Sequence, residues 1–457
     1  MNVTRRLFIK NGGIALASVG FAPLMGPVFL RQAAFGAQAT AGKRKKTLIC
    51  LFQRGAADGL NIVIPHGDKD LYRHRPQLAV PRPQSGTAAA ALDLDGFFGL
   101  HPALAPLMPL YKAGHLAAIH ACGSPDGTRS HFDAQDYMES GAPGDKRVAD
   151  GWLSRTVLAC PEDRAKLAAG GSGSPFRAVA LGGDHGLPRS LQGDAGAIAI
   201  PDLKTFGIGL ASAPAGRAGG GKKQQAAAAA TAATTGGASA GVVDGFETLY
   251  SGAVGDVLHG TGKESFEAIN LLKKAVPGTY VPANGAVYPA GRYGDSLKQI
   301  AQLVKADVGV EVAFAEMGGW DTHVNEGPRL TQQLREFGQG LAALYADLGD
   351  RMDDVVILTM SEFGRAVRSN GNQGTDHGHA TCFFALGGAV NGGKVLGKWP
   401  GLSEEQLYEN RDLALTTDFR TVFGEIAVRH LGAQGLQRVF PGYQGTPADF
   451  RGVIRAS

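Results

Sequence analysis

The chain has 457 residues, of which 44% are hydrophobic and 19% are charged. This balance excludes a disordered chain, a small disulfide-stapled scaffold and a collagen-like fibre. The length fits about two or three domains of ordinary size, or one large α/β domain. Glycine accounts for 67 residues, about 15% of the chain and about double the usual share, which predicts many loops and tight turns.

The formal net charge of +4 comes from the first 39 residues. This segment holds four basic residues and no acidic one, so the remainder has 41 basic residues (45 minus 4) against 41 acidic ones. A neutral remainder gives no reason to expect nucleic acid as a partner. The dense basic run at residues 43–46 is interpreted as a solvated tail.

Residues 1–39 resemble a twin-arginine signal peptide. The segment 4–10, TRRLFIK, is similar to the motif S/T-R-R-x-F-L-K, and Ala37-Gln38-Ala39 has the small-x-small pattern of a cleavage site. An N-terminal membrane anchor is the alternative, which the glycines and prolines between residues 14 and 30 disfavour. The resemblance implies export by the twin-arginine translocase to the periplasm or the exterior, with no stable membrane span after cleavage.

Runs of apolar residues with the length of strands recur along the rest of the chain. Most are continuously apolar, as expected for strands that are buried on both faces, and they lie at 47–53, 116–120, 178–181, 308–315, 355–360 and 382–386. Between them lie helical patterns at 102–111, 293–304 and 328–352. This order predicts an α/β fold with a doubly wound, mostly parallel central sheet and helices on both faces.

We expect residues 40–457 to form a single α/β domain. Residues 211–243 are rich in alanine and glycine and have almost no large apolar side chain, so they are predicted to be a flexible surface insertion. The four cysteines contain no C-x-x-C motif, and two of them lie in apolar runs. Buried free thiols are favoured, although an oxidising compartment would permit any of three disulfide pairings.

Polar residues capable of chemistry follow the predicted strands. In doubly wound sheets ligands bind beyond the carboxyl ends of the strands. The relevant segments here are 54–61, 123–133, 318–323, 361–365 and 374–379. Each contains an acid, a histidine or a hydroxyl group.

Two of these segments have the spacing of metal ligands. Asp321 and His323 are two residues apart, so in extended backbone both side chains point to one side, and His377 and His379 share this spacing beside Asp376. Carboxylate and imidazole donors suit zinc, manganese or iron, and turn hydrogen bonding is the alternative for either pair alone.

Two further residues have open roles. Ser130 precedes a predicted helix, where its hydroxyl could be a nucleophile assisted by the helix dipole or a plain N-cap. Arg365 could clamp an anionic group or pair with Glu362. The loop histidines His66, His101 and His185 are interpreted as solvated or hydrogen-bonded.

These motifs resemble the exported bacterial family called domain of unknown function 1501 (DUF1501). The matching segments are RGAADGLN (54–61), HPALAPL (101–107), GSPDGTRSHFDAQDYMESG (123–141), GGWDTH (318–323), LTMSEFGR (358–365) and GTDHGHA (374–380). The family is similar to the alkaline phosphatase and sulfatase superfamily. That likeness implies an alkaline-phosphatase-like fold with a two-metal site at the strand ends.

The superfamily pattern carries over in part. Its order implies Asp58 as a metal ligand, Ser130 as the nucleophile, and Asp321, His323 and Glu362 as further ligands. The Asp-His pair of the superfamily aligns either with Glu362-Phe363, where phenylalanine cannot bind metal, or with Asp376-His377, which leaves His379 as the last ligand. Both alignments stay open.

The sequence therefore supports two functions. The first is a hydrolase of phosphate or sulfate esters that depends on a divalent metal (zinc, manganese, calcium or magnesium). Its substrate would be a small anionic ester, Ser130 would attack it and Arg365 would stabilise the charge. The second is a non-catalytic periplasmic binding or assembly protein with the same fold, which the altered ligand spacings favour. The oligomeric state is left open.

Overall fold

The computed structural model describes residues 44–84, 86–160, 174, 176–183, 186–203 and 280–456. The expected signal peptide at 1–39 and the expected insertion at 211–243 lie outside these residues. The described residues from Lys46 onward belong to one compact unit. Among all described residues, no helix has both the length and the apolar character that crossing a membrane requires.

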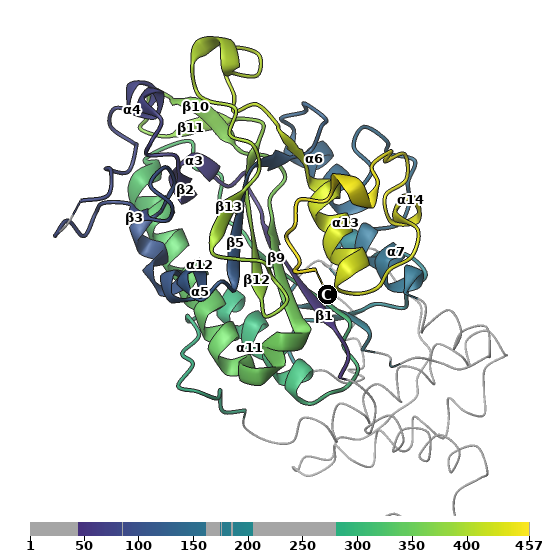
Figure 1. Cartoon of the computed structure of the whole chain (residues 1–457). Helices are drawn as coiled ribbons and strands as arrows, with labels where there is room; N and C mark the ends of the chain where they lie inside the picture. The colour runs from purple at the N-terminus through teal and green to yellow at the C-terminus, as the bar shows by residue number, and fades with distance from the viewer. Residues whose placement is uncertain are drawn as a thin grey trace, which may run out of the picture. The chain divides into compact units, whose positions relative to one another are not determined.

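One mixed sheet forms the centre of this unit (Figure 1). Its strands lie side by side in the order β13 (Lys394–Leu396), β5 (Leu116–Gly123), β12 (Thr381–Gly387), β9 (Val355–Met360), β1 (Thr47–Gln53), β8 (Val312–Met317), β6 (Ala178–Leu181) and β7 (Ile198–Ile200). β14 (Thr417–Asp418) also pairs with β5. All pairings are parallel except the two made by β12.

Helices cover both faces of this sheet (Figure 1). One face packs against α11 (Arg292–Lys305), α12 (Glu326–Leu348), the 3-10 helix η1 (Pro102–Leu107) and α5 (Met108–Lys112). The other packs against α6 (His131–Ser140), α7 (Trp152–Ala159), α13 (Phe419–Arg429) and α14 (Leu436–Val439). The predicted mostly parallel α/β fold is confirmed.

The alternation of side chains along each strand produces these two cores. In β1, Ile49 and Leu51 belong to the core on the α12 side, whereas Leu48, Cys50 and Phe52 belong to the core on the α13 side. Because successive side chains of a strand point to opposite faces, a continuously apolar strand contributes to both layers. This explains why the central strands lack the alternating pattern of a half-exposed sheet.

Three predicted elements differ from the structure at their ends. The strand predicted from residue 308 begins at Val312, because Asp307 and Gly309 have positive φ angles of 54° and 89°. The helix predicted over 102–111 is divided into η1 and α5, and Pro106 lies inside η1. α12 ends at Leu348, and the 3-10 helix η3 (Gly349–Asp354) follows it.

Smaller elements surround the sheet. β10 (Arg365–Ser369) and β11 (Thr375–His377) follow β9 and precede β12 in the chain, and they form a separate antiparallel pair. A three-stranded sheet contains β2 (Val63–Ile64), β4 (Gly99–Leu100) and β3 (Leu92–Asp93). The remaining short helices are α3 (Gly59–Ile62), α4 (Lys69–His74), η2 (Arg189–Leu191), η4 (Glu404–Gln406) and η5 (Pro447–Asp449).

The cysteines and the charges agree with the sequence analysis. Cys50, Cys122 and Cys382 are buried free thiols, and Cys160 is also buried, with its Sγ 3.4 Å from the carbonyl oxygen of Thr156.

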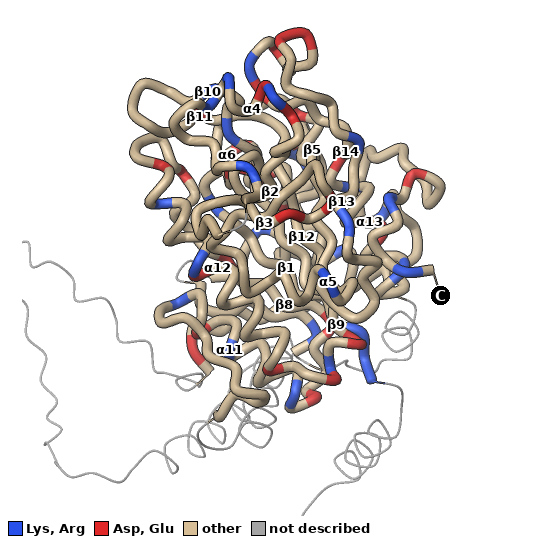
Figure 2. Tube along the Cα trace, turned by 60° about the vertical axis from the view of Figure 1, so that its left-hand side comes forward, with Lys and Arg blue, Asp and Glu red and all other residues tan. Residues whose placement is uncertain are grey.

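Basic and acidic residues are interspersed along the described trace in the view of Figure 2. This distribution fits the neutral balance of charge outside the first 39 residues.

Burial keeps three histidines neutral, which gives the fold a testable pH dependence. Burial lowers the pKa of His101, His120 and His430 to about 4 each. In His120 both ring nitrogens are engaged, since Nε2 donates to the carbonyl oxygen of Val63 at 2.8 Å and Nδ1 accepts from the N–H of Ala121 at 2.8 Å. Protonation of this ring therefore breaks a buried hydrogen bond.

We expect the free energy of unfolding to fall as the pH is lowered from about 6.5 toward 4. In this range the unfolded histidines bind protons that the folded ones do not, so acid favours unfolding. His120→Gln should make the fall shallower by up to about 1.4 kcal/mol per pH unit. Urea unfolding at several pH values measures this, and parallel curves for the two proteins would contradict it.

Candidate metal centre

Three histidines and one aspartate converge at one edge of the central sheet. His131 begins α6 after β5, Asp321 and His323 follow β8, and His377 ends β11, which follows β9. β8 and β9 are both parallel to β1, and β5 runs in their direction because β12 is antiparallel to both β5 and β9. The carboxyl ends of these strands therefore share one edge, as ligand sites in open α/β sheets do.

Their donor atoms lie close together. Nε2 of His377 is 3.0 Å from Nε2 of both His131 and His323, and 3.2 Å from Oδ1 of Asp321. Asp321 Oδ1 is 3.0 Å from His323 Nε2, and its Oδ2 is 3.6 Å from His131 Nε2. The ligand atoms of His131, Asp321 and His377 all lie within 4.8 Å of one another, which is the spacing of a group that could hold a metal ion.

The opposite ring nitrogens all contact oxygen acceptors. Nδ1 of His377 is 3.0 Å from the carbonyl oxygen of Arg129, and Nδ1 of His131 is 2.8 Å from Oε1 of Glu362. Nδ1 of His323 is 3.4 Å from Oδ1 of Asp376. A carbonyl or carboxylate oxygen can only accept, so these contacts assign the imidazole proton to Nδ1.

This assignment directs three Nε2 lone pairs at one another and at the Asp321 carboxylate. A shared proton could satisfy only part of such a group, whereas a divalent cation can accept from all four donors. Histidines that ligate metals commonly donate their second ring N–H to a carboxylate or a carbonyl, as these three do. The donor set thus fits a metal ion.

Glu362 is buried and accepts a hydrogen bond from His131, which orients the imidazole ring. Its side chain accepts from Nδ1 of His131, from Nε2 of Gln135 at 2.8 Å and from the N–H of Gly55 at 2.9 Å. Burial alone would raise the pKa of Glu362, but the hydrogen bonds from His131 and Gln135 outweigh it and lower the pKa. The hydrogen bond to Glu362 in turn raises the pKa of His131.

Arg365 pairs with Asp321 and not with Glu362, the partner weighed from the sequence. Its guanidinium is fully buried, and Nη1 donates to Oδ1 of Asp321 at 2.7 Å. Nε donates to Oγ1 of Thr375 at 3.0 Å, and Nη2 donates to the Thr375 carbonyl oxygen. Arg365 therefore positions the carboxylate of Asp321. Burial opposes ionisation of Asp321, but the bond and charge of Arg365 outweigh it and lower its pKa.

Two of the sequence-predicted ligands contact other groups. Asp58 is buried, and its Oδ2 accepts from Nη1 of Arg75 at 2.6 Å. His379 directs Nε2 at the carbonyl oxygen of Ser124, 3.0 Å away, and its ring lies against Tyr408. Neither side chain forms a hydrogen bond or ion pair with the four converging residues. Of the two alternatives from the sequence, the structure brings His377 and not His379 into the cluster.

The remaining predicted site residues lie around the cluster. Glu362 and Asp376 contact the outer nitrogens of His131 and His323, as described above. Ser130 occupies the N-cap position of α6, but its side chain makes no capping hydrogen bond. Phe363, which cannot bind metal, places its ring 5.0 Å from that of His131 and 5.1 Å from that of His377.

His131 is the cluster residue that the sequence analysis did not select. It follows Ser130 directly, within a segment that was recognised for its position after a predicted strand. His131 has no other candidate ligand at a short, regular spacing in the sequence, because its partners Asp321 and His377 are about two hundred residues away in the chain. A search for every histidine at a strand end would have included it.

A second buried group of charges lies beside the centre. Arg75 is fully buried and donates to Asp58 and to the carbonyl oxygens of Val367 and Ala366. Glu326 is buried nearby, and its pKa is raised well above the usual value by burial and by Asp58. Glu326 also accepts from Oγ1 of Thr375 at 2.6 Å. Thr375 thus joins this group to Arg365.

We expect Arg75→Met to lower the free energy of unfolding by about 3–5 kcal/mol, because it leaves the Asp58 carboxylate buried without its counter-charge. The double variant Asp58→Asn with Arg75→Met should recover part of this loss. Arg73→Met, at an exposed position of α4, which ends one residue before Arg75, is the matched control and should change stability by less than about 0.5 kcal/mol. Denaturant unfolding measures all three, and equal effects of Arg73→Met and Arg75→Met would contradict the role of the buried pair.

Comparison with solved structures finds the PsFucS1 sulfatase from Pseudoalteromonas sp., with 12% sequence identity and a TM-score of 0.34. The match covers 95% of this chain and 78% of that one. At this level the similarity indicates nothing about activity. No curated protein matches the chain in sequence.

Comparison with protein families gives one match, to the family described as "Protein of unknown function (DUF1501)", over residues 291–440. This region contains α11, α12, β8, β9 and β12 and three of the four converging residues, whereas His131 and Ser130 precede it. The resemblance that the sequence motifs indicate is therefore confirmed for residues 291–440, which match the DUF1501 family.

Proposed function

We propose that this protein is a metal-dependent hydrolase of phosphate or sulfate esters. The observation that carries the proposal is the convergence of His131, His323 and His377 through Nε2 on Asp321, with each Nδ1 at an oxygen acceptor. These four residues would hold the cation. Glu362, Asp376 and Arg365 would orient them from behind.

The donor set favours zinc or another transition metal. Three imidazoles and one carboxylate are typical ligands of zinc, manganese and iron, whereas calcium and magnesium prefer oxygen donors throughout. Manganese and iron are the alternatives that elemental analysis would separate from zinc. Asp58 and His379, which contact other groups, are not included in this ligand set.

The centre is open to solvent on one side. The side chains of Asp321 and His323 are 44% and 40% exposed, and those of His131 and His377 are 27% and 23% exposed. A catalytic metal needs one position that a substrate or water can reach. When bound, the cation would act as a Lewis acid toward an ester oxygen.

Ser130 is the nucleophile in this proposal. It lies between Arg129, whose carbonyl oxygen contacts His377, and His131, so its backbone is adjacent to the cluster. Its Oγ has no hydrogen-bond partner within the described part of the chain and is left free to react. Attack of Oγ on the phosphorus or sulfur would release the alcohol and leave a seryl ester, with solvent taking the serine proton and supplying one to the alkoxide. Water would then cleave the seryl ester, which releases phosphate or sulfate and restores the serine hydroxyl.

Arg365 has a different part in the proposal from the one that the sequence suggested. Its side chain is fully buried, and each of its three nitrogens donates to Asp321 or Thr375, so the guanidinium is held on these partners. We propose that Arg365 positions Asp321. Stabilisation of that charge would then come from the cation itself.

We also propose that residues 1–39 direct export by the twin-arginine translocase, with a periplasmic or secreted destination. The support is the twin-arginine motif at residues 4–10 and the small-x-small pattern at 37–39. This pathway carries folded proteins, which is compatible with a metal centre assembled before export.

The test is elemental analysis of the purified full chain, followed by assays on 4-nitrophenyl phosphate and 4-nitrophenyl sulfate. We expect about one bound metal ion per chain and turnover that EDTA abolishes. His377→Ala should lose the metal, whereas His379→Ala, the matched control two residues away, should retain it. Ser130→Ala should retain the metal and lose turnover.

Three outcomes would contradict the proposal. A chain without metal, or with metal that His377→Ala retains, would reject the centre. Metal without turnover of either ester would favour the non-catalytic binding protein that the sequence leaves as the alternative.

Glu362→Gln should lower the affinity for the metal by about 10- to 100-fold, because it removes the negative charge that faces the Nδ1 proton of His131. Competition with a chelating dye measures the affinity. Glu316→Gln is the matched control: Glu316 is paired with Arg54 and makes no contact with the histidines, so its loss should leave the affinity unchanged. Equal effects of both substitutions would argue against a specific role of Glu362.

A further inference from the structure

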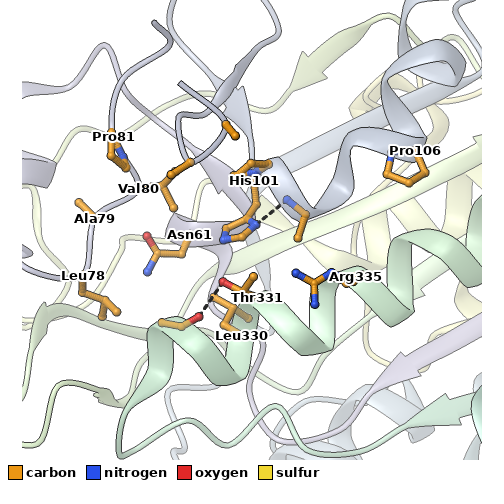
Figure 3. A pocket seen from close by; sticks show the side chains of 15 residues that line it. Asn61, Leu78, Ala79, Val80, Pro81, His101, Pro106, Leu330, Thr331 and Arg335 are labelled. Atoms are coloured by element: carbon orange, nitrogen blue, oxygen red, sulfur yellow. Dashed lines mark hydrogen bonds between the residues drawn. The ribbon is translucent and has the colours of Figure 1, made fainter. Parts of the chain in front are cut away.

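A cavity of about 590 Å³ lies apart from the metal centre (Figure 3). It is bounded by the first three turns of α12, by η1 and by the segment 78–81, and none of the four converging residues lines it. Its volume is typical of sites for small molecules. Most of the wall is apolar, with Leu78, Val80, Pro102, Pro106 and Leu330 among the lining side chains.

Two buried polar side chains line this cavity, and each has a polar atom without a hydrogen-bond partner among the described residues. Asn61 is 2% exposed, and its Oδ1 accepts no hydrogen bond within the described part of the chain. His101 is 5% exposed, and its Nδ1 accepts from the N–H of Ala103 at 3.1 Å, so the ring proton lies on Nε2. Burial keeps this ring neutral, since it lowers the pKa of His101 to about 4.

Asn61 and His101 therefore offer an acceptor and a donor side by side. Figure 3 shows the side chains of Asn61 and His101 next to each other on the wall of the cavity. A buried acceptor without a partner is costly, at about 1–3 kcal/mol, unless a ligand or water satisfies it. A hydroxyl group, which donates and accepts at once, matches this pair.

Arg335 supplies the charge of the cavity. It extends from α12 toward the cavity, and one of its nitrogens, Nη1, donates to Oε1 of Gln332 at 2.9 Å. No acidic residue is among the described residues that line the cavity. An arginine always carries its charge and binds carboxylates through its fork of donors. The cavity thus favours an anionic head group over a cationic one.

We propose that this cavity binds a small hydroxylated carboxylic acid with an apolar body. The carboxylate would pair with Arg335, the apolar body would contact the proline, valine and leucine side chains, and the hydroxyl group would lie between Asn61 Oδ1 and His101 Nε2. The inference does not rest on the proposed hydrolase, because the cavity and the metal centre share no residue.

The test is isothermal titration calorimetry of the full chain at pH 7 with 8-hydroxyoctanoate, octanoate and 1,8-octanediol. The flexible chain of these probes allows both ends to reach their partners. We expect 8-hydroxyoctanoate to bind most tightly, octanoate to bind several-fold more weakly because it lacks the hydroxyl group, and the diol to bind at least about tenfold more weakly because it lacks the charge.

Two variants identify the site. Arg335→Met should weaken the binding of both acids by about tenfold and leave the binding of the diol unchanged. Because Arg335 is exposed, the variant should fold as the original chain does. Arg329→Met is the matched control on the exposed side of the same helix, outside the cavity, and should change nothing. Asn61→Leu should reduce the affinity for 8-hydroxyoctanoate to that for octanoate.

Removal of metal distinguishes this site from the metal centre, which could also bind a carboxylate. Binding of the acids should persist after treatment with EDTA. The inference would be overturned by the absence of binding, by loss of binding with EDTA, by equal effects of Arg329→Met and Arg335→Met, or by a diol that binds as tightly as the acids.

Discussion

The hydrogen bonds on the outer side of the histidines are the interaction on which the centre depends. Each Nδ1 faces an oxygen that can only accept: a backbone carbonyl for His377 and a carboxylate for His131 and His323. These contacts hold the proton away from Nε2 and orient the ring. Without them the same rings could take the opposite tautomer, and their Nε2 atoms would repel a cation.

The topology of the sheet brings these contacts together. Among the described strands of the central sheet, only β12 runs antiparallel to its neighbours, and it lies between β5 and β9. Because β12 is antiparallel to both β5 and β9, these two strands run in the same direction. The loop after β5 therefore lies at the same edge of the sheet as the loops after β8 and β9. The β10–β11 pair then returns the chain over that edge and presents His377.

A continuous set of buried polar contacts supports the centre from within. Glu326 and Arg365 both contact Thr375, and Arg365 contacts Asp321. Burying so many charged groups has a high desolvation cost, which the pairing of each charge offsets. We interpret this set as the reason that the carboxylate of Asp321 keeps one orientation although nearly half of its side chain is exposed.

The sequence by itself determined the α/β class, the bounds of β1, β6 and β9, and the loops that hold most of the candidate residues, because apolar periodicity and turn residues are local properties. Tertiary structure decided which side chains meet: it includes His131, places His379 against Ser124, and pairs Arg365 with Asp321. The i, i+2 spacing of His377 and His379 predicts a shared side, but the β10–β11 pairing ends at His377. Gly378 then packs closely against the backbone of Arg365, and the chain bends at His379. Contacts between residues hundreds of positions apart leave no periodic signal, so only the folded chain decides them.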